Sequence, residues 1–379
     1  MDECPVARQS RAGCGVCACA WCPDDFIVSG RRRNLRRVVP GGKAPGHWDS
    51  HTLGVCAAAQ GVAGSLMPSR NWKDLSRQKP TAIALGNFDG VHLGHRRLLQ
   101  ALREESESRG LEPLALTFDP HPRHFLSPDQ KAPLLTPLEE KESLIRECGV
   151  TAITLAFDSE LAGLSAEHFV REVLVQRLRG ALFFLGPGHR FGKGAGGNAE
   201  SLRASVGNSS EDPVRETIPV VDETGEIISS SSIRRHLEAG HLDLANRMLG
   251  RPYCLRGVVV HGSERGREIG FPTANLGLED ERKALPAFGV YGGAVRYAGR
   301  TVAAIGNIGL RPTFSGDARP SVEVHLPGVD ENLYGKEMTF ELNHYLRPER
   351  KFDSIEALRT QIFEDVEFFR KLSLQGTLR

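Results

Sequence analysis

Residues 86–95, GNFDGVHLGH, lie where a short apolar strand, Thr81–Leu85, gives way to a helical pattern. Glycines let a backbone approach a polyphosphate closely, and the free amides and dipole of a helix start favour anionic oxygens. Two imidazoles three residues apart, His92 and His95, can donate hydrogen bonds to a phosphate whose charge shifts in the transition state. Either histidine alone would be read as a loop or capping residue. The pair, with these glycines after a strand, predicts a phosphoryl- or nucleotidyl-transfer site.

Helical and strand patterns alternate beyond this loop. Leu98, Leu99 and Leu102 form a helical apolar stripe that ends at Gly110. Further strands are predicted at 113–118, 150–157 and 181–185, and helices at about 137–148 and 166–179. We expect Thr136 to cap the first of these helices, because a proline and then an acid follow it. Strands alternating with helices predict an α/β, Rossmann-like domain with a parallel sheet.

The pattern changes near residue 250. Short β-branched runs separated by glycine turns occur at 258–260, 290–295, 302–308, 322–326 and 338–342. This spacing predicts an antiparallel β-barrel. Ser354 is expected to cap a C-terminal helix whose apolar face carries Ile355, Leu358, Ile362, Val366 and Phe369. We therefore expect a leader at 1–75, an α/β domain at 76–248 and a barrel domain at 249–379.

The leader holds most of the cysteines, at positions 4, 14, 17, 19, 22 and 56. Thiolates a few residues apart can converge on zinc or an iron–sulfur cluster, so a metal site is one interpretation. The segment is also rich in glycine, alanine and arginine and has no apolar periodicity, which favours a disordered extension or a start codon assigned too early, with Met67 as an alternative beginning. It resembles neither a secretory signal nor an amphipathic transit peptide.

Composition narrows the class of protein. The chain has 48 basic and 47 acidic residues, a balance that argues against a nucleic-acid partner. It contains no apolar stretch near the roughly 18 residues that a membrane span needs. Cys148 and Cys254 stand alone in the body of the chain, which is typical of a reducing compartment. We expect a soluble, cytoplasmic protein that binds neither nucleic acid nor membrane; its oligomeric state is left open.

Residues 86–95 resemble the signature of the nucleotidylyltransferase superfamily, and specifically of its bacterial FAD synthetase branch. Residues 117–122, TFDPHP, look like the turn of that branch after the second strand, and 229–234, SSSSIR, resemble its serine-rich ATP-binding motif. The resemblance implies catalysis by His92 and His95. It implies nucleotide binding by Gly86, Asn87, Phe88, Asp89, Gly90, Gly94, Ser230, Ser231 and Arg234. Two stretches depart from the pattern: Gly188-His189 before Arg-Phe-Gly, and Ser231-Ser232 where Thr-Arg is usual.

Residues 262–275, GSERGREIGFPTAN, resemble the glycine-rich loop and Pro-Thr-Ala-Asn step of riboflavin kinases. The resemblance extends from Gly257 to the final helix. It implies that Thr273 and Asn275 ligate Mg²⁺ and the nucleotide phosphates. It also implies that Gly262, Gly266 and Gly270 shape the phosphate loop.

Residues 321–326, SVEVHL, resemble the strand that carries the catalytic carboxylate of riboflavin kinases. By that resemblance Glu323 accepts the proton of the attacking hydroxyl, while Arg350 contacts phosphate or flavin. On strand alternation Glu323 and His325 share one face, opposite Val322 and Val324. Taken alone, the same pattern would fit the solvated face of an edge strand.

Together these resemblances predict an enzyme that phosphorylates riboflavin to FMN and adenylylates FMN to FAD, using Mg²⁺ and ATP. Three alternatives stay open at this point. The chain could have kinase activity alone, it could bind flavin or nucleotide without catalysis, or its transferase half could act on another substrate.

Overall fold

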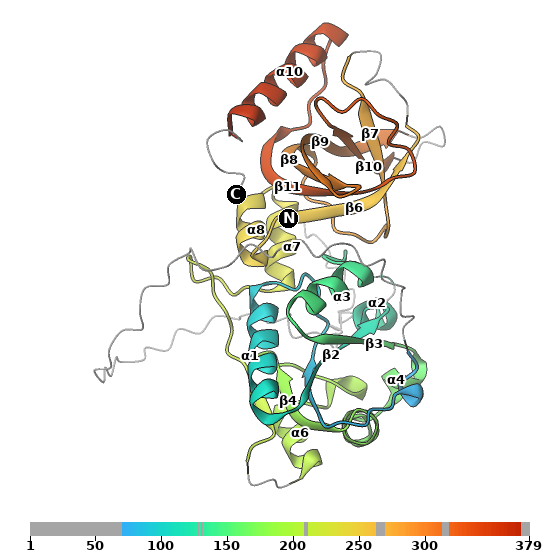
Figure 1. The fold of residues 1–379 in the computed structure, drawn as a ribbon, viewed down its shortest axis with the longest axis vertical. Coiled ribbons are helices and arrows are strands. Elements are labelled where there is room, and N and C mark those ends of the chain that lie inside the picture. The colour runs from blue at the N-terminus through green and yellow to red at the C-terminus, as the bar shows by residue number, and fades with distance from the viewer. Residues whose placement is uncertain are drawn as a thin grey trace, which may run out of the picture.

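The computed structural model describes residues 70–127, 129, 132–207, 211–262, 270–312 and 318–372. A parallel sheet with its helices forms one end of the molecule and a closed barrel forms the other, with helices α7 (Ser230–Glu238) and α8 (Leu242–Leu249) between them (Figure 1). The predicted order of an α/β half, an antiparallel barrel and a C-terminal helix is confirmed. The cysteine cluster of the leader and Gly266 lie outside the described residues.

The sheet has the strand order β3-β2-β1-β4-β5, and all its neighbouring strands are parallel. The strands are β1 (Thr81–Leu85), β2 (Glu112–Asp119), β3 (Thr151–Ala156), β4 (Gly180–Leu185) and β5 (Val214–Glu216). Every residue of the central strand β1 is buried. This is the signature of a parallel strand covered on both faces, and it explains the continuous apolar run in the sequence.

Strand alternation separates the two layers that cover the sheet. Ile83 and Leu85 pack in the same buried cluster as the π-helix η2 (Phe169–Arg177), whereas Ala82 and Ala84 pack with helix α1 (Leu93–Arg109) on the other face. The other elements of this half are η1 (Trp72–Asp74), α2 (Pro122–Leu126), α3 (Leu138–Glu147), α4 (Ser159–Gly163), α5 (Ala166–His168), η3 (Lys193–Ala195) and α6 (Ala199–Val206). The result is the three-layer arrangement expected of an α/β domain.

Two local expectations in this half were wrong. The leader was expected to run to residue 75, but Trp72 and Leu75 are buried in the core of the sheet domain. Thr136 does not cap α3: Pro137 occupies the N-cap position with no side-chain cap, and the Thr136 hydroxyl accepts a hydrogen bond from the Gly90 amide at 2.9 Å. The Thr136 hydroxyl therefore makes a tertiary contact with Gly90 instead of the helix cap that the local sequence pattern predicted.

The barrel closes in the order β10-β7-β6-β11-β8-β9, so none of its strands is an open edge. Its strands are β6 (Tyr253–Val260), β7 (Thr273–Leu278), β8 (Gly289–Tyr297), β9 (Arg300–Pro312), β10 (Ala318–His325) and β11 (Glu337–Pro348). The interpretation of residues 322–326 as an edge strand is thereby wrong, because β10 pairs with both β7 and β9. Val322 and Val324 point into the core, and Glu323 and His325 lie on the opposite face, as alternation predicts.

Strand β7 was missed by the sequence patterns. Its residues, TANLGL, lack a β-branched run and were interpreted only as part of a nucleotide loop. They pair with β6 on one side and β10 on the other. The ladder therefore imposes the extended conformation, since propensity for strands depends strongly on the neighbours.

Helix α10 (Ile355–Leu372) packs on the outside of the barrel through Phe369, which meets Val290 and Ile305. Ser354 caps it as predicted, because its Oγ accepts the Ala357 amide at 3.1 Å. The expected apolar face is only partly covered, and Ile355 is 62 % exposed. In the part of the chain that the structure describes, no helix has the length and hydropathy to cross a bilayer.

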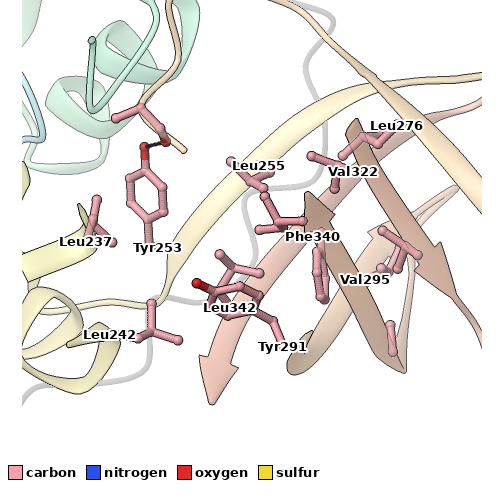
Figure 2. Packing of buried hydrophobic residues seen from close by; sticks show 14 of the residues in the cluster. Leu237, Leu242, Tyr253, Leu255, Leu276, Tyr291, Val295, Val322, Phe340 and Leu342 are labelled. Atoms are coloured by element: carbon pink, nitrogen blue, oxygen red, sulfur yellow. Dashed lines mark hydrogen bonds between the residues drawn. The ribbon is translucent and has the colours of Figure 1, made fainter. Parts of the chain in front are cut away.

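One apolar cluster spans the two halves. The largest cluster of buried residues joins Leu135 and Ile233 to Leu242 of α8 and to the barrel interior. Figure 2 shows Tyr253 between Leu237 and the barrel residues around Leu342, with its hydroxyl hydrogen-bonded. That hydroxyl donates to the Ala284 carbonyl oxygen at 2.6 Å. Burial of this kind ties the sheet domain, the two connecting helices and the barrel into one packed unit.

Candidate functional site

A cavity of about 460 Å³ opens at the carboxyl ends of the parallel strands. Its walls come from segments that directly follow four strands, namely Gly86 after β1, His121 after β2, His189 after β4 and Thr217 after β5. Most residues of the loop 86–95 line it, and the first turns of α1 and α7 border it. Ligands in open α/β sheets bind in this position, where the sheet continues to opposite sides of a central strand.

The loop needs unusual backbone angles to bring its histidines to the cavity. Phe88 (φ 50°), Gly90 (φ 88°) and Val91 (φ 39°) all have left-handed conformations, which are rare for side chains branched at Cβ. A Cβ at Gly94 would lie 3.1 Å from the ring of His92. Glycine at this position therefore lets the ring lie close to the backbone. Strain of this kind is retained where surrounding contacts enforce it, which is common at functional sites.

His92 and His95 stack on each other, with ring centroids 3.7 Å apart. His92 is the N-cap of α1, and its Nδ1 accepts the His95 amide at 3.4 Å. Because Nδ1 accepts, the proton of the neutral ring lies on Nε2. Among the described residues, none hydrogen-bonds the buried Nδ1 of His95. The pair thus offers ring nitrogens for a ligand at a helix N-terminus.

Four histidines line the cavity as neutral imidazoles. Burial lowers the pKa of His95 and of His189 to about 4 and that of His121 to about 3. Burial, and then the charge of His95, holds the pKa of His92 well below its usual value. These rings can donate hydrogen bonds at neutral pH without carrying charge.

These depressed pKa values predict that the protein loses stability as the pH falls from 6.5 towards 4. Above pH 6.5 the rings are neutral in both states; below it the unfolded chain binds protons that the folded chain does not. His95, His121 and His189 should each remove up to about 2 kcal/mol from the free energy of unfolding at pH 5. Urea unfolding at pH 7.5 and 5.0 measures the difference, and H189Q should reduce it. A pH-independent free energy of unfolding would contradict the prediction.

Asp89 is the buried anion of the cavity. Its carboxylate forms an ion pair with Arg234, with Oδ2 2.5 Å from Nη2. Burial alone would raise the pKa of Asp89, but Arg234, His121 and two backbone amides lower it overall. Ser230 donates through Oγ to the Asp89 carbonyl oxygen at 2.9 Å. The serine-rich motif therefore fastens α7 to the loop, and Ser232 completes the capping box with Ser229 at the helix start.

A second polar group lies on the outer face of the barrel. The ladder places Asn275 of β7 and Asn307 of β9 opposite Glu323 of β10, one on each side. Asn307 donates through Nδ2 to Glu349 Oε1 at 2.9 Å. Thr273 lies two residues before Asn275, on the same face. Register alone therefore brings together a row of oxygen-bearing side chains from three strands.

Two glycines shape the approach to this row. A Cβ at Gly262 would lie 2.0 Å from Nδ2 of Asn275, so the backbone after β6 passes directly against that side chain. Gly270 has φ 83° at the turn into β7. Arg350 does not join the row: it donates to Gln361 and its guanidinium lies 4.6 Å from the ring centroid of Phe352.

The structure unites most of the residues selected from sequence and adds others. The transferase residues of the loop other than Gly90, with Ser230 and Arg234, line the cavity; Gly90 and Ser231 are not among its lining residues. The sequence did not predict the contributions of His121, His189 and Thr217 to the cavity. These residues are far apart along the chain, and only the parallel order of the strands brings them together. His189 belongs to a stretch singled out only as a departure from the family pattern. Asn307 and Glu349 lay in matching segments, but no local signal distinguished them.

The structure combines a cavity at the end of a parallel sheet with a barrel that carries a carboxylate between two amides. These two sites define the class of the protein as a two-domain transferase. The FAD synthetase family model matches residues 74–232, and the riboflavin kinase family model matches residues 249–373. The chain belongs to the bifunctional riboflavin kinase/FMN adenylyltransferase family.

Individual relatives support this membership along both halves. The bifunctional riboflavin kinase/FMN adenylyltransferase of Escherichia coli (strain K12) is 39% identical over 290 residues, which is 76% of this chain and 91% of that protein. Its counterpart in Bacillus subtilis (strain 168) is 35% identical over 292 residues, with the same two shares. A crystal structure described as a macrolide-efflux protein from Streptococcus pneumoniae aligns with a TM-score of 0.72 at 32% identity, covering 79% of this chain and 97% of that chain. The predicted enzyme class, with both activities of FAD synthesis from riboflavin through FMN, is confirmed at the level of the family.

Proposed function

We propose that this chain makes FAD at two separate sites, phosphorylating riboflavin on the barrel and adenylylating the resulting FMN in the sheet cavity. The observation that carries the proposal is the separation of the two sets of groups. His92 and His95 line the cavity at the sheet edge, whereas Glu323 lies in the row on the barrel. ATP serves as the second substrate at each site.

In the cavity, the FMN phosphate oxygen attacks the α-phosphorus of ATP. A new oxygen–phosphorus bond forms, the bond to the bridging oxygen breaks, and pyrophosphate leaves. His92 donates from Nε2–H to the phosphate oxygens, and the amides at the start of α1 add their dipoles. Catalysis of this kind consists mainly of positioning and electrostatic stabilisation. Arg234 contributes by holding Asp89, and a phosphate reaching the cavity would share its guanidinium.

On the barrel, Glu323 accepts the proton of the ribityl 5′-hydroxyl as its oxygen attacks the γ-phosphorus of ATP. ADP is the leaving group. A carboxylate on a rigid, fully paired strand is suited to this role, because the ladder holds it in one position. Asn275 and Asn307 on either side provide amide groups that can orient the hydroxyl or a phosphate oxygen.

Two side chains of the row fit a magnesium ion. Thr273 and Asn275 offer a hydroxyl and an amide oxygen, ligands that suit this hard cation while it keeps several waters. Across the described ranges no three His, Cys, Asp or Glu side chains converge on a metal position, so the hydroxyl and amide oxygens are the expected protein ligands. When bound with ATP, Mg²⁺ would neutralise phosphate charge.

The division of the chain and its location complete the proposal. We place the boundary between the two catalytic halves at 248/249, one residue before α8 ends at Leu249 and shortly before β6 begins at Tyr253. The balanced charge and isolated cysteines support a cytoplasmic location.

Incubating the full chain with riboflavin, Mg²⁺ and excess ATP tests both sites at once. FMN should appear first and FAD should follow as FMN is consumed, resolved over time by chromatography. Accumulation of FMN without FAD would favour the alternative of a kinase alone, in which the changes at Gly188 and His189 have disabled the cavity. Flavin binding with no ATP turnover would instead indicate a binding protein.

A further inference from the structure

A buried lysine of the barrel half reaches into the sheet domain. The side chain of Lys283 is 3% exposed, and its Nζ lies 2.7 Å from Oε2 of Glu140 on α3. Nζ also donates to the Leu135 carbonyl oxygen at 2.6 Å and lies 4.5 Å from the ring centroid of Tyr253. A buried ammonium is costly unless it is paired and hydrogen-bonded, so these partners fix its position.

The Lys283 ammonium contacts a short segment, residues 133–136, which we name the strap. The strap is bonded to the barrel along its backbone. The Leu134 amide donates to the Arg282 carbonyl oxygen, and the Ala284 amide donates to the Leu134 carbonyl oxygen, each at 2.7 Å. These two bonds and the lysine are contacts between the two domains, and all three lie within a few residues of each other.

The other side of the strap holds the nucleotide loop. The amides of Leu135 and Thr136 donate to the two carboxylate oxygens of Asp89, at 3.2 and 2.9 Å. The Thr136 hydroxyl accepts the Gly90 amide at 2.9 Å. Asp89 and Gly90 lie just ahead of Val91 and His92, so the strap holds the loop close to the histidine pair.

Arg251, at the junction between α8 and β6, contacts the same loop directly. Its Nη2 donates to the Gly90 carbonyl oxygen at 2.8 Å, and its Nη1 lies 3.4 Å from the Val91 carbonyl oxygen. Nη2 also lies 3.9 Å from Glu140, the partner of Lys283. The two cations therefore share a carboxylate, and Arg251 contacts the loop directly while Lys283 contacts the strap that binds it.

We propose that Lys283 and Arg251 are positioning residues for adenylyl transfer, which hold Asp89 and Gly90 in place through the strap and make the reaction depend on the docked barrel. The inference rests on the function proposed above, because it concerns the same cavity. Neither cation is among the residues that line the cavity. Their effect is geometric: a misplacement of about 1 Å at reacting groups can cost about 100-fold in rate.

The test uses the full chain and measures two reactions in one preparation. FAD formation is followed from supplied FMN and ATP, and FMN formation from riboflavin and ATP. In K283M, kcat for FAD formation should fall about ten- to hundredfold while FMN formation stays within about twofold. K283R, which keeps the charge and most of the reach, should recover most of the loss.

Lys336 provides the matched control. Its Nζ lies 2.7 Å from Glu331 and 5.8 Å from the ring centroid of Tyr297, so it too combines a carboxylate with an aromatic ring, but within the barrel alone. K336M should leave both reactions unchanged. FAD formation within about twofold of the wild type in K283M would overturn the proposal, as would equal loss of both reactions in K283M and K283R.

A pH profile of R251M separates positioning from a merely structural role. Burial, then His95 and then Arg251, lower the pKa of His92, so loss of the guanidinium should move the acid limb of kcat/KM for FAD formation to higher pH. A lower rate with an unmoved acid limb would remove Arg251 from the proposal. Absence of FAD with the wild-type chain would instead contradict the proposed function itself.

Discussion

Replacement of His95 by alanine is expected to abolish FAD formation from FMN while leaving FMN formation from riboflavin at the wild-type rate. The His95 ring stacks on the His92 ring, and its centroid lies 5.2 Å from that of the Phe88 ring. The substitution therefore removes one hydrogen-bonding ring and leaves the His92 ring without its stacking partner. Loss of one preorganised donor at a developing charge typically costs about a hundred- to a thousandfold in rate. Separate assays with FMN and with riboflavin as the flavin substrate measure the two reactions.

Two outcomes of the His95 experiment are informative. Equal loss of both reactions would contradict the model of separate sites. H168A serves as the control, because His168 lies exposed on α5 in the same half and does not line the cavity. Its rate of FAD formation should match that of the wild type.

Replacement of Glu323 by glutamine is expected to have the reverse effect, with FMN formation lost and FAD formation from supplied FMN retained. Glutamine keeps the size and hydrogen-bonding capacity of the side chain between Asn275 and Asn307, but it cannot accept the proton of the hydroxyl. A general base typically contributes about a hundred- to ten-thousandfold in rate. Initial rates with riboflavin and ATP provide the measurement.

The matched control for Glu323 is another barrel glutamate. Glu341 of β11 pairs with Arg296, with Oε1 2.9 Å from Nη2, and it lies outside the row of Asn275, Glu323 and Asn307. E341Q should leave both reactions intact. Kinase activity that survives in E323Q would show that another group, or the solvent, takes the proton.

Local sequence predicted the elements whose patterns are self-contained. The continuous apolar run of β1, the glycine loop with its two histidines and the alternation around Glu323 all match the structure. Such features follow from periodicity and backbone chemistry over a few residues, which the sequence states directly. Local sequence therefore predicts most of the residues that line the cavity and the alternation that sets Glu323 opposite the barrel core.

Features that depend on distant partners were missed. Strand β7 exists because β6 and β10 flank it, and Thr136 binds Gly90 rather than capping α3. In each case a long-range contact overrides a weak local preference. Ile355 is a different case, because its spacing predicted burial but its apolar side chain stays exposed.

By itself, therefore, the sequence determined which residue types stand at the loop, in the row and at the helix starts. These residues were enough to indicate the family. Only the tertiary structure decided what these residues meet. Parallel strand order brings His121 and His189 to the histidine pair, and ladder register places Asn307 beside Glu323. Docking of the barrel places Lys283 on the strap behind Asp89. The physical reason is that pairing and packing join groups far apart along the chain, and no local pattern encodes which groups will meet.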